Sequence, residues 1–120
     1  MNKSVKLKLD KLWSKAVKVR AGYKCERNPS HKSDTTKSLN SHHLFTRSAM
    51  STRWSMMNGI CLCVGCHRYA HREPLDFHEW VKGYKGEDWY NALRRMKHTP
   101  NKPDPAIIEI MLNNEIYECE

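Results

Sequence analysis

The chain has 120 residues, of which 28% are charged, and a formal net charge of +8. This length fits one domain with a small core, and such a domain needs a staple such as a bound metal. No apolar run approaches the roughly 18 residues of a membrane span, and the lysine-rich N-terminus lacks the apolar stretch of a signal peptide. We therefore expect a cytoplasmic protein without a membrane segment.

The charge is distributed unevenly along the chain. All 21 Lys and Arg residues precede position 104, together with eight of the 13 acidic residues. Residues 1–103 thus carry +13, and residues 104–120 carry −5. A body this basic favours nucleic acid as a partner, ahead of an acidic membrane surface. The alternative is a set of solvated lysines with no partner.

The first expected element is a helix over residues 10–22. Apolar residues recur at helical spacing across residues 9–17, with lysines on the other faces. Asp10 is a candidate N-cap, and Gly22 is a candidate end. Residues 5–9 alternate between apolar and basic side chains, so an extended lead-in stays open.

Two strands and a helix are expected in the middle of the chain. Residues 37–43 predict a strand, and residues 58–62 predict a second one. The segment between them, residues 44–57, lacks periodicity and is expected to be a long loop. Residues 64–72 predict a helix that ends before Pro74.

Three further helices follow. Aromatic and aliphatic stripes predict helices over residues 75–84 and 87–98, separated by glycines. Residues 99–105 read as a rigid linker, with Asp104 as N-cap and Pro105 as the first residue of the last helix. This acidic helix (residues 104–120) has an apolar face, expected to include Ile107, Ile108, Met111, Leu112 and Ile116. It either docks on the body, residues 1–103, or binds a partner protein or a second copy of the chain.

Cysteines in metal-ligand spacing indicate a structural zinc site. Cys63 and Cys66 form a C-x2-C pair, and tetrahedral closure requires two more ligands. In a reducing compartment such cysteines read as metal ligands before disulfides. Cys25 is the best third ligand. His31 is the preferred fourth ligand, with Cys61 and a water molecule as alternatives.

Histidines in the same region indicate a second metal site. His67 and His71 are four residues apart on the expected helix, so they lie on one face and can bind one ion. His42 and His43 are adjacent on the expected strand and point to opposite faces, which favours one as a ligand and the other as a proton acceptor. Asn58 lies fifteen positions after His43. Each of these residues alone could be structural.

Taken together, residues 23–71 resemble the HNH endonucleases, the nuclease group with a ββα-metal active site. The resemblance implies that His42, His67 and His71 hold one catalytic divalent metal ion, while His43 is the general base and Asn58 orients it. It also implies an α+β fold, a mostly helical small domain around this motif. Neutral nitrogen ligands favour Zn, Ni, Co or Mn over Mg.

The cysteines are similar to those of the zinc-stapled HNH subgroup, which usually supplies a second C-x2-C pair upstream. This chain has only Cys25 there. The segments HHLFTR and STRW are also similar, more weakly, to the Rap-type recombination nucleases of lambdoid phages. That similarity implies a phage protein for recombination or packaging, acting in the cytoplasm of a bacterial host.

The expected function is hydrolysis of DNA phosphodiester bonds, as nicks or double-strand breaks, with low sequence specificity. An imidazole with an unperturbed pKa of about 6.5 can take the proton of the attacking water near neutral pH. Arg47 and Arg53 are candidates for binding the phosphate, or else ordinary solvated arginines. The competing interpretation is a non-catalytic, zinc-stapled module for DNA binding or recruitment.

Overall fold

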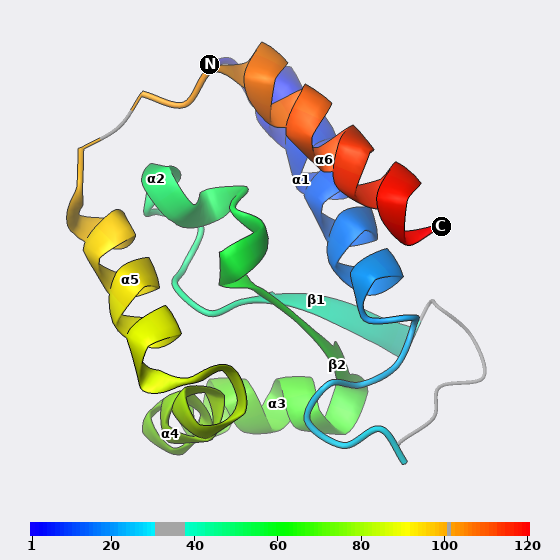
Figure 1. Ribbon diagram of the computed structural model, residues 1–120, viewed down its shortest axis with the longest axis vertical. Helices are drawn as coiled ribbons and strands as arrows, with labels where there is room; N and C mark the ends of the chain where they lie inside the picture. The colour runs from blue at the N-terminus through cyan, green and yellow to red at the C-terminus, as the bar shows by residue number, and fades with distance from the viewer. Residues whose placement is uncertain (31–37, 101) are drawn as a thin grey trace.

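The computed structural model describes residues 1–30, 38–100 and 102–120. It is a mostly helical α+β domain around a two-stranded sheet, which confirms the expected fold class (Figure 1). In chain order the elements are α1 (Lys3–Arg20), β1 (Leu39–His43), α2 (Met50–Arg53), the 3₁₀ helix η2 (Met56–Asn58), β2 (Gly59–Cys63), α3 (Val64–Arg72), α4 (Pro74–Lys85), α5 (Glu87–His98) and α6 (Pro105–Cys119).

Helix α1 begins earlier than the sequence predicted. Asn2 is its N-cap, and the Asn2 side chain accepts a hydrogen bond from the backbone N–H of Val5. Asp10 therefore lies inside the helix. The prediction of an N-cap at Asp10 was wrong, and the extended lead-in that the sequence left open does not occur, because the lysines that alternate with apolar residues also fit the solvent-facing side of a helix.

The end of α1 is a glycine-dependent turn, as predicted. Gly22 has a φ of +65°, a left-handed conformation that costs glycine little. Its N–H donates to the carbonyl oxygen of Val19, and the N–H of Tyr23 donates to that of Lys18. This pair of bonds is a Schellman motif, which satisfies the last carbonyls of the helix and turns the chain towards Cys25.

The two strands are antiparallel, and their register pairs Leu39 with Cys63 and His43 with Gly59. Alternate side chains point to opposite faces of the sheet. One face meets α1, and there the Ser41 hydroxyl donates to the carbonyl oxygen of Ser14, 2.7 Å away. The other face meets α3 and carries His42.

Two apolar clusters, one on each face of the sheet, form the core. The cluster on the α1 side includes Leu9, Trp13, Val17, Leu39, Cys61, Leu112 and Ile116. The cluster on the α3 side includes Ile60, Leu62, Cys66, Ala70, Phe77, Val81, Tyr90 and Leu93. In Figure 1, α1 and α6 lie on one side of the hairpin, and α3 and α4 lie on the other. The sheet is thus packed on both faces.

Helix α6 docks on α1, the first of the two alternatives that the sequence left open. The two helices run side by side in the same direction (Figure 1), and ion pairs join Lys8 to Glu109 at 2.9 Å and Lys15 to Glu120 at 3.8 Å. Leu112 and Ile116 are buried against α1. Two residues expected on the packed face do not lie there: Ile107 and Met111 are 56% and 65% exposed.

The remaining boundaries agree closely with the sequence. Helices α3 and α5 have the predicted ends, and Asp104 caps α6 by accepting a hydrogen bond from the N–H of Ala106. The predicted long loop differs, because it contains α2 and η2. No helix in the described part of the chain has the length and apolar character needed to cross a bilayer.

Candidate metal centres and active site

His42, His67 and His71 converge from two elements. His42 projects from β1, and the other two lie one turn apart on α3. Each offers a ring nitrogen, and the three nitrogens lie within 4.8 Å of one another. The Nε2 atoms of His67 and His71 are 3.1 Å apart. Two nitrogens on one tetrahedral ion at Zn–N distances of 2.0–2.1 Å would be about 3.3 Å apart, so the spacing suits a shared metal ion.

The electrostatics of this histidine site also suit a cation. Burial, and then the neighbouring histidines, lower the pKa of His42 to about 3. Burial also lowers the pKa of His67, with a smaller effect from His71. Both rings are therefore neutral at pH 7, with a lone pair available for a metal. Phe77 packs edge-on against His42 with the ring centroids 5.1 Å apart, which restrains the ring of His42.

His43 points to the opposite face of β1, as alternation predicted. Its ring stacks on Trp13 with the centroids 3.8 Å apart, and its Nε2 lies 3.0 Å from the carbonyl oxygen of Arg53. A carbonyl oxygen only accepts, so Nε2 carries the proton and Nδ1 keeps its lone pair. Burial lowers the pKa of His43 to about 4, although the bond to Arg53 opposes the shift. This ring is a neutral proton acceptor at pH 7.

Asn58 holds the chain that leaves β1. It is fully buried, and its side chain exchanges two hydrogen bonds with the backbone of Phe45: the amide Nδ2 donates to the carbonyl oxygen at 2.9 Å, and the N–H donates to Oδ1 at 2.7 Å. The backbone carbonyl of Asn58 also accepts from the N–H of Leu44. Asn58 thus ties Phe45, two positions after His43 in the chain, to the start of β2.

Gly59 lies opposite His43 and lets α1 approach the sheet. A Cβ atom at this position would lie 2.4 Å from Cγ2 of Val17 and 2.9 Å from the ring of Trp13. Because Trp13 stacks on His43, the close approach of α1 at Gly59 also positions that imidazole.

A cavity of about 460 Å³ joins the two faces at the end of β1. Its lining contains the metal-site histidines and His43, so a metal ion and a proton acceptor would face one space. The lining residues are Asp10, Trp13, Ser14, Ser41, His42, His43, Thr46, Arg47, His67 and His71. The sequence did not predict the contribution of α1, because only the packing of α1 on the sheet places Asp10, Trp13 and Ser14 there.

The two candidate phosphate-binding arginines differ in their surroundings. The side chain of Arg53 is 14% exposed and is bound to Asp10 through Nε at 3.0 Å and Nη2 at 2.7 Å. The side chain of Arg47 is 62% exposed, lines the cavity and lies 3.7 Å from the Asp10 carboxylate. Arg47 is therefore the arginine that can reach a ligand in the cavity.

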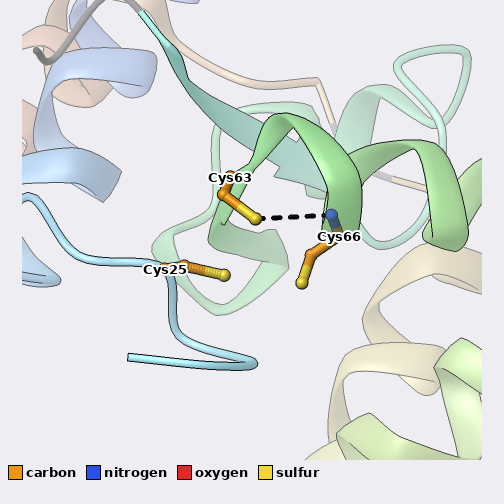
Figure 2. A group of neighbouring side chains, drawn as sticks. All are labelled: Cys25, Cys63 and Cys66. Atoms are coloured by element: carbon orange, nitrogen blue, oxygen red, sulfur yellow. Dashed lines mark hydrogen bonds between the residues drawn. The ribbon is translucent and has the colours of Figure 1, made fainter. Parts of the chain in front are cut away.

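The cysteine site lies at the other end of the hairpin. Cys25 reaches it from the loop after α1, while Cys63 and Cys66 come from the end of β2 and the first turn of α3 (Figure 2). The three sulfur atoms lie within 4.8 Å of one another, and the N–H of Cys66 donates to Sγ of Cys63. This buried group of three thiols fits a metal ion and is compatible with zinc.

The side chains of Arg27 and Glu26 make hydrogen bonds at the cysteine site. A guanidinium N–H of Arg27 donates to Sγ of Cys66 at 3.5 Å. Burial raises the pKa of the Cys66 thiol to about 11, although the bond to Arg27 opposes the shift. Glu26 holds Cys25 in place, because its carboxylate accepts from the N–H of Cys61 and its own N–H donates to the carbonyl oxygen of Cys61.

Of the two protein side chains considered as the fourth zinc ligand, the structure describes only Cys61. His31 lies outside the described residues. Cys61, an alternative ligand, is buried in the cluster on the α1 side and does not belong to the group of three thiols.

Comparisons of the chain with protein-family models, with curated proteins and with solved structures gave no match.

Proposed function

We propose that the chain is a metal-dependent endonuclease of the ββα-metal, HNH type that hydrolyses DNA phosphodiester bonds. One observation carries the proposal: three histidines that fit a divalent ion and a fourth histidine with an available lone pair line one cavity. The antiparallel strand pair followed by α3 supports it, because this order of elements presents the residues of the resemblance together.

Phosphodiester hydrolysis requires a water molecule to lose a proton as its oxygen attacks phosphorus and the bond to the leaving oxygen breaks. In the proposed reaction, Nδ1 of His43 accepts that proton, since Nε2 is engaged with the carbonyl of Arg53. A divalent ion held by His42, His67 and His71 would supply Lewis-acid stabilisation of charge on the phosphate and the leaving oxygen. Asn58 keeps the strand end, and thereby His43, in place.

DNA is the proposed substrate because of charge. The chain before residue 104 carries a formal +13, which attracts a polyanion. At the cavity, Arg47 is exposed and can pair with phosphate oxygens, whereas Arg53 is committed to Asp10. Contacts of this kind hold the backbone without reading bases, so low sequence specificity is part of the proposal.

A structural zinc at Cys25, Cys63 and Cys66 is the second part of the proposal. Three thiolates would surround the ion, and the guanidinium of Arg27 would offset part of their negative charge. The metal would join the α1 loop to the start of α3, the helix that carries His67 and His71. The proposed zinc therefore supports the geometry of the catalytic site.

Supercoiled plasmid incubated with Mn, Ni, Co, Zn or Mg tests the nuclease proposal. We expect conversion to nicked or linear DNA with at least one of these ions, and no conversion when a chelator is present. His67→Ala should abolish the reaction, and His98→Ala, an exposed histidine on α5, should leave it unchanged. Binding of the plasmid without cleavage under every ion would contradict the enzyme and favour the non-catalytic DNA-binding module.

A further inference from the structure

Asp10 is a carboxylate on the wall of the cavity that none of the steps above uses. Its side chain is only 15% exposed. Oδ1 accepts from Nε of Arg53 at 3.0 Å and from the indole N–H of Trp54 at 2.9 Å, and Oδ2 accepts from Nη2 of Arg53 at 2.7 Å. Asp10 is not in the group of histidines that fits a metal ion. Its three hydrogen bonds go to residues 53 and 54, and the exposed guanidinium of Arg47 lies 3.7 Å from Oδ2.

Residues 53 and 54 belong to the segment that orients His43. Arg53 is the last residue of α2, and its backbone carbonyl oxygen accepts from Nε2 of His43 at 3.0 Å. The same residue thus binds Asp10 through its side chain and His43 through its backbone. Trp54, the next residue, is 5% exposed and is held by the same carboxylate. A bidentate pair fixes both the position and the orientation of a guanidinium, which a single bond does not.

We propose that Asp10 is a positioning residue for the cleavage reaction: through Arg53 and Trp54 it fixes the carbonyl oxygen that keeps the proton of His43 on Nε2. Nδ1 then keeps its lone pair as the proton acceptor, on a ring that lines the cavity. The inference rests on the proposed function, and it assigns Arg53 to the support of His43 and leaves phosphate binding to Arg47.

Two substitutions loosen this arrangement in different ways. Asp10→Asn removes the negative charge and replaces one of the two acceptor oxygens by an amide nitrogen. Arg53→Lys keeps the positive charge but loses the planar guanidinium that makes two parallel hydrogen bonds. Ile116→Ala is the control, because it removes buried contacts on α6 and touches none of these bonds. Should Asp10→Asn fail to fold, Arg53→Lys alone decides.

The readouts are nuclear magnetic resonance of the ring nitrogens of His43, assigned with His43→Ala, and the rate of plasmid cleavage with saturating DNA. In the parent we expect the tautomer protonated on Nε2. In both variants we expect a mixture of tautomers and cleavage slower by about 10- to 100-fold, the range for a misplaced catalytic group, with no loss of metal or DNA affinity. Ile116→Ala should keep the tautomer and the rate of the parent.

Each other outcome is decisive. The parent's tautomer in both variants overturns the proposal, whatever the rate, and so does a mixed tautomer with the parent's rate. If the parent never cleaves DNA, the proposed nuclease activity is wrong. If the tautomer of His43 still shifts in the variants of that inactive protein, the link between Asp10 and His43 stands without it.

Discussion

At the scale of single residues, the electrostatics of His43 change the expected pH dependence. Its pKa is lowered to about 4 by burial, whereas an imidazole in the unfolded chain titrates near 6.5. Between these values the unfolded chain binds the proton and the folded chain does not, so the contribution of His43 to stability is present above about pH 6.5 and is lost as the pH falls towards 4.

The test is denaturant unfolding of the parent and of His43→Gln at about pH 7.5 and pH 5. Glutamine does not titrate, so the parent should lose more free energy of unfolding than the variant when the pH is lowered. Equal losses in the two proteins would mean that His43 is not held neutral by burial. For the same reason, the rate of cleavage should begin to fall only below about pH 6–7, the range in which an unperturbed imidazole becomes protonated.

Substitution of Gly59 tests the contact between α1 and the sheet. Gly59→Ala places a methyl group against Val17 and Trp13, and overpacking of this kind costs about 1–3 kcal/mol. Gly83 in α4 is the matched control, because a Cβ there meets no atom within 4 Å and alanine favours the helix. We expect a lower melting temperature for Gly59→Ala and an equal or higher one for Gly83→Ala. Unchanged melting of Gly59→Ala would contradict the close approach of α1.

At the scale of elements, α6 is part of the core. Leu112 and Ile116 are buried against α1, and burial of one such side chain contributes about 1.5–3 kcal/mol. Truncation after Lys102 should therefore lower the melting temperature markedly and expose Leu9 and Trp13. A truncated chain as stable as the parent would mean that α6 does not hold α1 in solution.

The charge of α6 needs a different test, because truncation disturbs the fold. Replacing Glu115 and Glu118 by glutamine leaves the ion pairs of Glu109 and Glu120 in place. If the acidic helix competes with DNA for the basic body, the variant should bind non-specific DNA more tightly and with a steeper salt dependence. Unchanged binding would restrict α6 to its packing role or to a protein partner.

The cysteine site joins the α1 loop to α3, and a metal ion there would couple binding to folding. Cys66→Ser should release zinc and lower the melting temperature sharply. Cys119→Ser, which changes an exposed cysteine of α6, is the control and should do neither. Full zinc content with parental melting in Cys66→Ser would rule out this ligand set.

At the scale of the whole molecule, spacing along the chain predicted most of each candidate metal group, and the resemblance chose His42 over His43, but neither predicted the enclosure around the histidines. Helical spacing places His67 beside His71, and strand alternation separates His42 from His43. Nothing local to Asp10 indicates that α1 crosses the sheet at Gly59 and brings this carboxylate to Arg53. That contact joins positions 43 residues apart, and only tertiary packing determines it.

The same limit explains the errors in the elements. The start of α1 and the 3₁₀ helix η2 depend on the caps Asn2 and Ser55, and α2 depends on burial against neighbouring segments, none of which periodicity alone captures. The apolar face of α6 was overestimated for a related reason. Apolar residues are spread around the whole circumference of this helix, between its polar and acidic ones, so only its packing on α1 selects Leu112 and Ile116.

In the proposed reaction, adjacent residues on β1 divide two roles between them: His42 binds the metal ion and His43 accepts the proton. Calorimetric titration of the parent, His42→Ala and His43→Ala with the activating metal ion, combined with plasmid cleavage, separates the two roles. His43→Ala should bind the ion as the parent does and cleave about 10²–10⁴-fold more slowly, while His42→Ala should lose metal affinity and regain part of its activity at high metal concentration. Loss of the ion in His43→Ala, with binding retained in His42→Ala, would mean that the two histidines have the opposite roles.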